Sequence, residues 1–308
     1  MKILITGGAG FIGSHIVDKY VDLGHRVEVI DDMSSGLVEN MRDDVTYHEI
    51  DIRSSKVTAV FDEGTFDVVN HHAAQMDVRK STEDPAFDAD VNIIGSINLL
   101  QNCVRTNVKQ FIFASTGGAI YGEQDAYPAD ETHPANPVSP YGISKLSIEK
   151  YLHYYDVEYG IIHSILRYSN VYGPRQNPHG EGGVIAIFAK KLLQGEQVII
   201  NGDGKQTRDY TYIDDIVRLN ELVLASDKCT LINAGRGMEY DVNYLYDLLK
   251  QEMGSTMEAK HGPRVPGEQR RSSIKSDRAM QLFSWKAEVD FESGISKTAD
   301  FFKLNKES

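Results

Sequence analysis

The stretch that decides the fold is Lys2-Ile3-Leu4-Ile5-Thr6-Gly7-Gly8-Ala9-Gly10-Phe11-Ile12-Gly13. Its apolar first half predicts a buried strand, and Gly7, Gly10 and Gly13 follow before a helix-length segment. Without side chains, this backbone can turn tightly and approach a pyrophosphate at the positive end of the next helix. The stretch therefore predicts a strand, loop and helix that bind a dinucleotide. The weaker alternative is a glycine-rich turn without a ligand.

Short β-type runs alternate with helix-length segments through the first two thirds of the chain. Such an order predicts parallel βαβ units with helices on both faces of one sheet. We therefore expect an α/β fold with a Rossmann-type, doubly wound parallel sheet. Apolar residues at helical spacing predict helices at 85–106 and 140–159, which could form a dimer face. The predicted strands are residues 3–6, 27–30, 45–50, 68–70, 111–114 and 162–166.

A second region is predicted to begin near Tyr172, where glycine and proline become frequent. We expect residues 1–172 to form the dinucleotide-binding domain, with residues 205–236 returning to it through a late strand at 230–234. Residues 173–308 would mainly form a smaller, discontinuous α/β domain that binds the substrate.

Composition and charge exclude several classes of protein. The chain has 308 residues, of which 41% are hydrophobic, and its formal charge of −13 argues against a surface for nucleic acid or anionic membranes. No apolar stretch approaches the roughly 20 residues that a membrane helix needs. We therefore expect a cytoplasmic protein that binds neither nucleic acid nor a membrane.

The candidate metal ligands do not form a recognisable motif. Only Cys103 and Cys229 occur, in unrelated contexts, so neither a disulfide framework nor a zinc site is indicated. His71 and His72 are adjacent on a predicted strand, so their side chains point to opposite faces, and core packing or a supporting role is the expected one. We expect no metal.

Asp31 and Asp32 end the second predicted strand. A carboxylate at this place accepts hydrogen bonds from the adenosine ribose hydroxyls and repels the additional phosphate of NADP. A basic residue directly after Asp31 could restore NADP binding, but Asp32, Met33 and Ser34 follow. NAD is therefore the expected cofactor.

Two further segments fall where the third and fourth strands would end. Asp51-Ile52 could flank the adenine, and Ala73-Ala74-Gln75 offers small residues beside the dinucleotide. Both would complete the cofactor site at the carboxyl edge of the sheet.

Tyr141 and Lys145 lie four residues apart in the predicted helix 140–159. Residues four apart share a helix face, so the Lys145 ammonium can lie beside the Tyr141 phenol and favour its phenolate. That would make the tyrosine usable as a base near neutral pH. Tyr246 and Lys250 form a second such pair, which we interpret as ordinary helix surface.

The order of these motifs along the chain resembles the extended short-chain dehydrogenase/reductase family. More narrowly, the chain resembles the nucleotide-sugar 4-epimerases, and the resemblance covers essentially its whole length. The matching residues include His72-Ala73-Ala74-Gln75 and Asp31-Asp32-Met33-Ser34-Ser35-Gly36 with Asn40. The most specific matches are Arg167-Tyr168-Ser169-Asn170-Val171-Tyr172-Gly173-Pro174 and Gly202-Asp203-Gly204-Lys205-Gln206-Thr207-Arg208-Asp209-Tyr210.

The resemblance implies an epimerase that interconverts UDP-glucose and UDP-galactose. Tyr141 would remove the proton from the sugar 4-hydroxyl while C4 passes hydride to NAD, with Lys145 beside it. The resulting 4-keto sugar would turn over and take hydride back on its other face. Thr116 would hydrogen-bond the reacting oxygen, with Ser115 as its neighbour on the cofactor side. Counting back from Tyr121-Gly122 would place Gly117 there instead, and a glycine has no hydroxyl.

The resemblance also implies contacts along both ligands. Asn170 and Arg208 would contact the substrate diphosphate, Arg264 would be the second clamp, and Glu268 would hold the uridine ribose; each arginine has a surface charge as its alternative reading. Arg264 has one residue more before Gly267 than the usual pattern. The implied NAD contacts are Gly7, Gly10, Phe11, Ile12, Gly13, Asp31, Asp32, Ser35, Gly36, Asp51, Ile52, Ala73, Ala74, Gln75, Asn92, Ser115, Tyr141, Lys145, Tyr168 and Val171. The implied substrate contacts are Thr116, Tyr141, Asn170, Arg208, Arg264, Glu268 and Ser272.

Related reactions remain as alternatives. Nucleotide-sugar 4,6-dehydratases and glucuronate decarboxylases resemble the epimerases but carry carboxylates after the catalytic threonine, where this chain has Gly117-Gly118-Ala119. Ser272 matches the residue beside the sugar C2 substituent, and its small size predicts room for N-acetylated sugars. Some proteins of this fold only sense NAD, but these commonly lose the tyrosine or the lysine. The family also suggests a homodimer with four helices at its interface.

Overall fold

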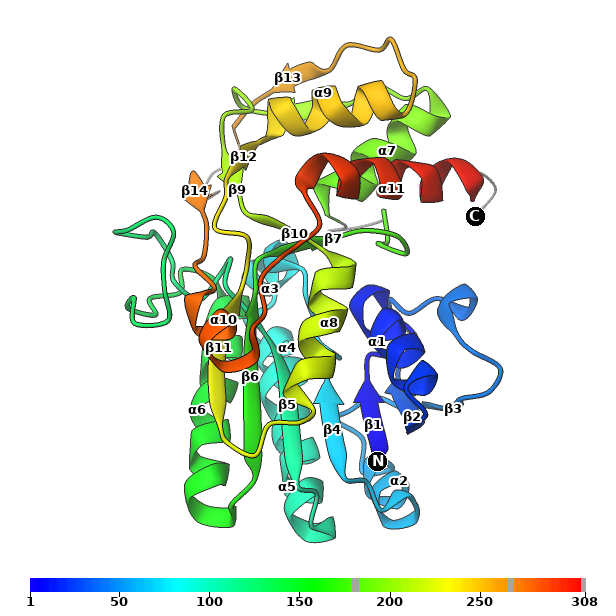
Figure 1. Ribbon diagram of the computed structural model, residues 1–308, viewed down its shortest axis with the longest axis vertical. Helices are drawn as coiled ribbons and strands as arrows, with labels where there is room; N and C mark the ends of the chain where they lie inside the picture. Colours follow the sequence, from blue (N-terminus) through cyan, green and yellow to red (C-terminus); the bar gives the residue numbers. More distant parts are fainter. Residues whose placement is uncertain (179–182, 265–268, 306–308) are drawn as a thin grey trace.

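The computed structural model describes residues 1–178, 183–264 and 269–305. Its centre is a parallel sheet with the strand order β11-β6-β5-β4-β1-β2-β3 (Figure 1). The predicted doubly wound α/β fold is therefore confirmed. The strands of this sheet are β1 (Lys2–Thr6), β2 (Arg26–Asp31), β3 (Thr46–Glu49), β4 (Val68–His71), β5 (Gln110–Thr116), β6 (Ile162–Tyr168) and β11 (Thr230–Ala234).

Alternate residues of each strand face opposite sides of the sheet, and each side has its own helices. Ile3 and Ile5 of β1 pack in one apolar cluster with Leu219, whereas Leu4 packs in the other with Leu152. The first cluster lies under α1 (Phe11–Asp22) and α8 (Ile213–Val223), and the second lies under α2 (Val57–Gly64), α5 (Gly95–Thr106) and α6 (Pro140–Tyr159). Both faces of the sheet are thus buried, as a parallel sheet requires.

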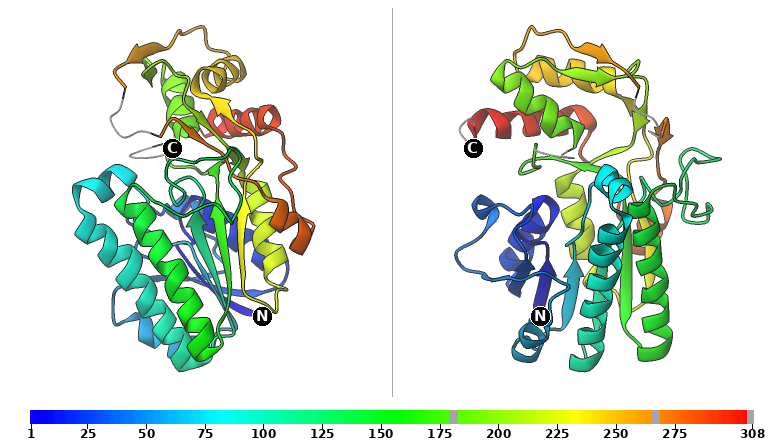
Figure 2. Two further views of the ribbon diagram at one scale, coloured as in Figure 1. Left: turned by 90° about the vertical axis from the view of Figure 1, so that its left-hand side faces the viewer. Right: turned by 180° about the vertical axis from the view of Figure 1, so that it is seen from behind.

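The predicted helix at 85–106 is helical throughout but not uniform. It consists of α4 (Pro85–Ala89), a π-helical segment at Asp90–Ile94 and α5. A short helix, α3 (Val78–Glu83), precedes it. Figure 2 shows α5 and α6 side by side along one face of the molecule.

Helix α6 has strong signals at both ends. Ser139 caps it, because its hydroxyl oxygen accepts a hydrogen bond from the Gly142 amide at 3.2 Å, and Pro140 occupies the first turn. Gly160 ends the helix with a φ of +70°, a left-handed conformation that favours glycine. The ideal Cβ of Gly142 would lie 2.8 Å from the Ala119 oxygen, so the first turn of α6 packs closely on the turn after β5.

A third apolar cluster lies beyond the carboxyl edge of the sheet. Its buried residues include Tyr172, Phe188, Leu245 and Phe291. Tyr246 also belongs to it and is buried, so the interpretation of the Tyr246 and Lys250 pair as ordinary helix surface is wrong for the tyrosine. The helices around this cluster are α7 (Val184–Gln194), α9 (Val242–Glu252) and α11 (Phe291–Leu304).

Several short strands connect this part of the chain to the sheet. They pair as β7 with β10, β8 with β13, and β9 with both β12 and β14. A short helix, α10 (Asp277–Phe283), packs against β11. Within the described residues, no helix is long and apolar enough to cross a membrane. The short strands are β7 (Asn170–Tyr172), β8 (Ile199–Asn201), β9 (Thr207–Arg208), β10 (Tyr210–Tyr212), β12 (Tyr240–Asp241), β13 (Lys260–Gly262) and β14 (Arg271–Ser272).

Candidate active site

The glycine-rich loop joins β1 to α1 in a conformation that needs its glycines. Gly7 has a φ of +72°, and a Cβ on it would lie 2.6 Å from the Ala73 nitrogen. A Cβ on Gly13 would lie 2.1 Å from the Gly7 oxygen, whereas one on Gly10 would meet only that oxygen, at 3.3 Å. The loop therefore packs closely against other backbone atoms at Gly7 and Gly13. At Gly10, directly before α1, only the Gly7 oxygen would lie near an added Cβ, so the backbone is accessible there. This is the backbone surface that a pyrophosphate can approach.

Asp31 lies at the end of β2, directly beside this loop. Its two carboxylate oxygens accept hydrogen bonds from the amides of Ala9 and Met33, each at 2.9 Å. Burial raises the pKa of Asp31. A Cβ on Gly36 would lie 2.9 Å from Asp31 Oδ1, so only glycine lets that loop pass so close. Asp32 is exposed and accepts hydrogen bonds from Ser34 instead.

The loop after β4 is fixed by Asn92 in the π-helical segment. Asn92 Oδ1 accepts from the Gln75 amide at 2.9 Å, and Asn92 Nδ2 donates to the Gln75 carbonyl at 2.9 Å. Ala73 and Ala74, the small residues predicted to lie beside the dinucleotide, are half-buried in the same loop. Asn92 thus holds the loop, and its own amide group is occupied by these bonds.

The remaining predicted cofactor residues lie around the same edge. Asp51 pairs with Arg53 at 2.5 Å, and Ile52 is buried against Gly95. Tyr168 is buried, with its hydroxyl 3.2 Å from His72 Nε2. The others are Phe11 and Ile12 in the first turn of α1, Ser35 on the exposed loop after β2, and Val171 in β7.

Both adjacent histidines contact other side chains inside the protein. His71 bonds Thr6 through Nδ1 at 2.6 Å and Ser96 through Nε2 at 2.8 Å. His72 stacks on Tyr168 instead. The prediction that these two side chains point to different sides and have supporting roles is confirmed.

Lys145 is buried in α6 and joins that helix to β5. Its ammonium donates a hydrogen bond to the Ala114 carbonyl at 2.9 Å and lies 5.8 Å from the centre of the Tyr141 ring. Burial lowers the pKa of Lys145 to about 8, while Asp88 opposes this shift. Lys145 therefore keeps a charge near neutral pH in a position beside the phenol.

Burial and the nearby Asp88 charge favour the neutral form of the Tyr141 phenol when no ligand is considered. Burial raises the pKa of its phenol well above the ordinary value, and the Asp88 charge raises it further. Asp88 is completely buried, and it accepts hydrogen bonds from Gln75, Asn92 and Ser144. The burial of Asp88 could not be predicted from the sequence, because an aspartate in a predicted helix is usually exposed.

Thr116 is the last residue of β5, which runs two residues further than predicted. Its hydroxyl oxygen accepts a hydrogen bond from the Ala119 amide at 3.2 Å, which leaves its proton available to donate. Ser115 faces the other side and donates to Glu149 at 2.7 Å. Gly117 lies beyond the strand, where a Cβ would collide with Ile274 at 2.4 Å. Thr116 thus has a hydroxyl proton available at the turn against which α6 packs.

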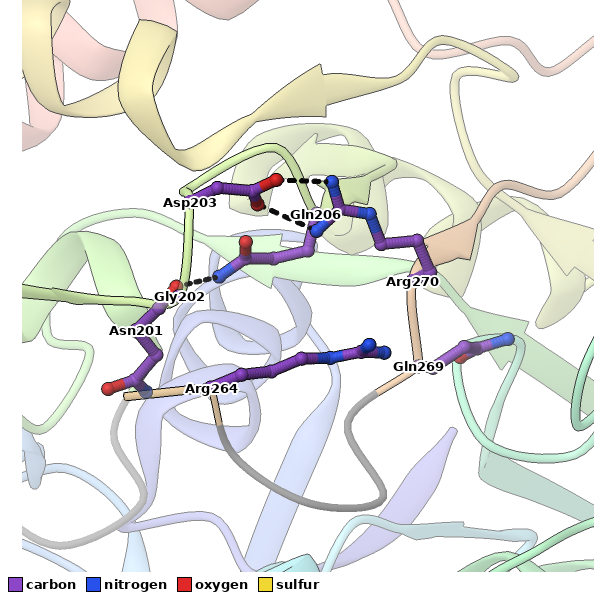
Figure 3. Close-up of a pocket in the computed structure, with 7 residues that line it drawn as sticks. All are labelled: Asn201, Gly202, Asp203, Gln206, Arg264, Gln269 and Arg270. Carbon is purple, nitrogen blue, oxygen red and sulfur yellow. Dashed lines mark hydrogen bonds and ion pairs between the residues drawn. The ribbon is translucent and has the colours of Figure 1, made fainter. Parts of the chain in front are cut away.

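A pocket of about 410 Å³ is lined by residues in and next to the short strands β8, β9 and β14 (Figure 3). Arg264 extends across it toward Gln269, and Arg270 forms a forked ion pair with Asp203 at 2.7 and 2.9 Å. The predicted Glu268 lies outside the described residues. The lining residues are Asn201, Gly202, Asp203, Gln206, Arg264, Gln269 and Arg270.

Of the predicted substrate contacts, Arg264 lines this pocket. Asn170 donates through Nδ2 to the Asp209 carbonyl at 3.2 Å. Arg208 in β9 pairs in register with the buried Ser272 of β14. Asn201 and Gln206 were missed as lining residues, although Gln206 lies within the motif that contains Arg208.

Comparisons with known proteins define the class. A model of the NAD dependent epimerase/dehydratase family matches residues 3–235. The chain belongs to this family, and the predicted resemblance is confirmed.

Individual relatives narrow the comparison. The chain is similar to the UDP-glucose 4-epimerase of Thermotoga maritima with UDP-glucose, with a TM-score of 0.98, 44% identity and 100% of both chains covered. It is also similar to the Thermus thermophilus UDP-glucose 4-epimerase in complex with NAD, with a TM-score of 0.95 and 40% identity, over 99% of this chain and 100% of that one. The UDP-glucose 4-epimerase of Mycolicibacterium smegmatis is 39% identical over 98% of this chain and 99% of its own.

Proposed function

We propose that the protein is an NAD-dependent UDP-glucose 4-epimerase that interconverts UDP-glucose and UDP-galactose through a transient 4-keto sugar. The observation that carries this proposal is that α6, which carries Tyr141 and Lys145, packs on the end of β5, which carries Thr116, at the edge of the sheet where the glycine-rich loop lies. The full-length similarity to UDP-glucose 4-epimerases supports the same reading.

The glycine-rich loop and Asp31 fit NAD. The bare backbone at the start of α1 suits the pyrophosphate, and the buried Asp31 carboxylate suits the adenosine ribose diol. Bound NAD supplies a reversible hydride acceptor, and its positive nicotinamide favours ionisation of a nearby phenol. This effect matters because the protein alone raises the pKa of Tyr141.

The protein's own residues move and hold the proton. Tyr141 takes the proton from the sugar 4-hydroxyl and returns it to the same oxygen after the sugar has turned over. Lys145 keeps a positive charge beside the phenol, and Thr116 donates a hydrogen bond to the reacting oxygen. One tyrosine thus serves as base and acid, as a reaction without net oxidation requires.

Residues in the short strands and in the segments next to them would bind the nucleotide sugar. Arg264 spans the pocket, and Asn170 and Arg208 lie toward the sheet, where guanidinium and amide groups can bind the diphosphate. Glu268 is proposed for the uridine ribose. Residues 173–308 would therefore mainly hold the nucleotide sugar, while residues 1–172 with 205–236 would hold NAD.

Elimination and decarboxylation are less well supported. Both reactions need an acid or base near C5 and C6, and the turn after Thr116 contains Gly117, Gly118 and Ala119 only. A protein that only senses NAD would not need Tyr141, Lys145 and Thr116 together. Epimerisation is the reaction that uses all three side chains and no further one.

We also propose a homodimer through α5 and α6. These helices lie side by side, and large apolar residues are exposed on α6 and directly before α5. A second copy could cover this face in a four-helix arrangement. The exposed residues are Ile94 before α5, and Ile143, Tyr151, Tyr154, Val157 and Tyr159 on α6.

The function is tested by product analysis of purified protein on a panel of UDP- and dTDP-sugars without added NAD. We expect UDP-glucose and UDP-galactose to interconvert, because a closed redox cycle needs only retained cofactor. Formation of a 4-keto-6-deoxy sugar or release of carbon dioxide would contradict the proposal. So would the absence of turnover in protein that has been loaded with NAD.

A further inference from the structure

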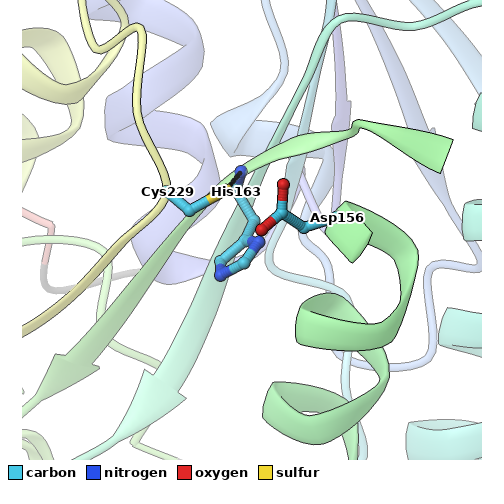
Figure 4. A group of neighbouring side chains, drawn as sticks. All are labelled: Asp156, His163 and Cys229. Carbon is cyan, nitrogen blue, oxygen red and sulfur yellow. Dashed lines mark hydrogen bonds between the residues drawn. The ribbon is translucent and has the colours of Figure 1, made fainter. Parts of the chain in front are cut away.

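Asp156, His163 and Cys229 come together at the end of the sheet opposite to the glycine-rich loop (Figure 4). Asp156 lies near the end of α6, His163 is the second residue of β6, and Cys229 directly precedes β11. A carboxylate oxygen, a ring nitrogen and the cysteine sulfur all lie within 4.8 Å of one another. Asp156 and His163 lie close together in the sequence, whereas Cys229 lies far from both, so the three residues form no recognisable spacing motif.

One ring nitrogen of His163 is buried here without a hydrogen-bond partner among the described residues. His163 is only 7% exposed, and none of the described residues forms a hydrogen bond with its Nδ1. A buried polar atom without a partner destabilises a fold unless something binds to it. Burial also lowers the pKa of His163, which favours the neutral ring that a metal ion requires.

Nucleophilic catalysis by this cysteine does not fit its surroundings. Burial raises the pKa of Cys229, and the Asp156 carboxylate raises it further. A reactive cysteine needs the opposite, a positive environment that stabilises the thiolate. A divalent cation would supply that positive charge directly.

We propose that Asp156, His163 and Cys229 bind one zinc(II) ion. Bonds of about 2.0–2.3 Å in a tetrahedral site set ligand atoms roughly 3.3–3.8 Å apart, so atoms within 4.8 Å need to approach by about 1 to 1.5 Å at most. A thiolate and a carboxylate balance the charge of the ion, and the sulfur and nitrogen ligands favour zinc over magnesium or calcium.

Binding involves no change of oxidation state. The Cys229 thiol loses its proton to solvent as the zinc–sulfur bond forms, and waters of the ion's hydration shell leave as the three side chains bind. The fourth position holds a water or the imidazole of His153, which precedes Asp156 by three residues and so shares its helix face. Asp156 and Cys229 are partly exposed, which gives the ion a path of entry.

The ion would join the end of α6 and the start of β6, which follow each other in the chain, to the segment before β11, which lies far away in the sequence. Helix α6 and strand β6 would be linked to the segment before β11, which is the edge strand of the sheet. A ligand that binds only the folded state stabilises it. We therefore expect zinc to raise the melting temperature and to leave epimerase turnover unchanged, since Tyr141 lies at the other end of α6.

The first test uses the wild-type protein after chelation. Cys229 is partly exposed whereas Cys103 is fully buried, so a thiol reagent should modify Cys229 alone in the folded protein. One equivalent of Zn²⁺ should slow this reaction by at least about tenfold. Co²⁺ should add a sulfur-to-metal charge-transfer band. Unchanged thiol reactivity together with no such band would overturn the proposal.

The second test uses variants, with Zn²⁺ affinity measured by competition against a chromogenic chelator. Cys229→Ser and His163→Asn should each weaken binding by at least about tenfold, because each removes a ligand. Cys103→Ala is the matched control and should bind zinc as the wild type does. Equal affinity of Cys229→Ser and the wild type would contradict the site. Should a variant not fold, the wild-type thiol and Co²⁺ measurements still decide.

Discussion

The Lys145 ammonium donates a hydrogen bond to the Ala114 carbonyl oxygen, with 2.9 Å between the two atoms. This bond ties α6 to the last residues of β5. Tyr141 lies one helical turn before Lys145, and Thr116 lies two residues after Ala114. One buried contact therefore links the elements that carry the proposed base and the proposed hydroxyl donor, before any substrate binds.

Tyr141→Phe is expected to lower kcat by at least about 10²–10⁴-fold, because it removes the only proton carrier proposed for the sugar oxygen. NAD should remain bound, since the ring itself is kept. The measurement is turnover together with the NAD content of the purified protein. Tyr151→Phe, an exposed tyrosine of the same helix, is the control and should behave as the wild type. Substantial activity of Tyr141→Phe would remove this residue from the mechanism.

Turnover should fall as the pH rises through about 8, because burial lowers the pKa of Lys145 to about 8 and the neutral amine no longer favours the phenolate. The pH dependence of kcat checks this. An activity that stays flat to pH 10 would contradict the role of Lys145.

Lys145→Met should change stability in a way that depends on pH. Below about pH 8 the wild type bears the cost of a buried ammonium. Between about 8 and 10.4 the unfolded state binds more protons than the folded state, so the wild type's free energy of unfolding rises with pH. The free energy of unfolding of the variant should thus be at least that of the wild type at pH 7. The difference between the two should be smaller at pH 10. Thermal unfolding at both pH values measures it.

Asp31→Asn should weaken NAD binding by about 10-fold or more, since a charged acceptor for the ribose is lost and one of two backbone amides loses its partner. Discrimination against NADP should also fall, because the repelling charge is gone. Dissociation constants for both cofactors check this. Asp32→Asn is the matched control, and its exposed side chain should matter little. If Asp32→Asn weakened NAD binding more than Asp31→Asn, Asp32 rather than Asp31 would be the residue that binds the ribose.

Glu149→Ala should destabilise the protein by about 3–5 kcal/mol, because it leaves the buried Arg167 without its ion pair. Ser115 would also lose its acceptor. Urea unfolding measures the loss. Glu221→Ala breaks the partly exposed pair with Lys19 and should cost less than about 1 kcal/mol. Similar losses in both variants would show that burial does not decide the strength of these pairs.

The wild type should act on both UDP-glucose and UDP-GlcNAc, because Ser272 in its proposed position would leave space beside the sugar C2 substituent. Ser272→Tyr should abolish turnover of UDP-GlcNAc and retain that of UDP-galactose, since an aromatic ring would fill this space. Initial rates on both substrates test the prediction. Good UDP-galactose activity of the wild type with no UDP-GlcNAc turnover would contradict it.

Much of the fold could be predicted because its signals are local. The glycine-rich loop, the apolar strands and the caps of α6 each depend on residues close in sequence, and the helix predicted at 140–159 has these bounds in the structure. The late strand at 230–234 was also correct and lies at the edge of the sheet beside β6. By contrast, the burial of Tyr246 depends on α7 and α11, which lie far away in the sequence.

The sequence by itself determined the doubly wound sheet, the family and the residue types of the candidate site, since periodicity and motifs survive without knowledge of distant contacts. Only the tertiary structure decided which hydroxyl of Ser115 and Thr116 is available, because the choice depends on Glu149, more than thirty residues away. It also decided the ionisation of Tyr141 and Lys145, since burial and the Asp88 charge act through space. The meeting of Asp156, His163 and Cys229 likewise exists only once the strands have paired.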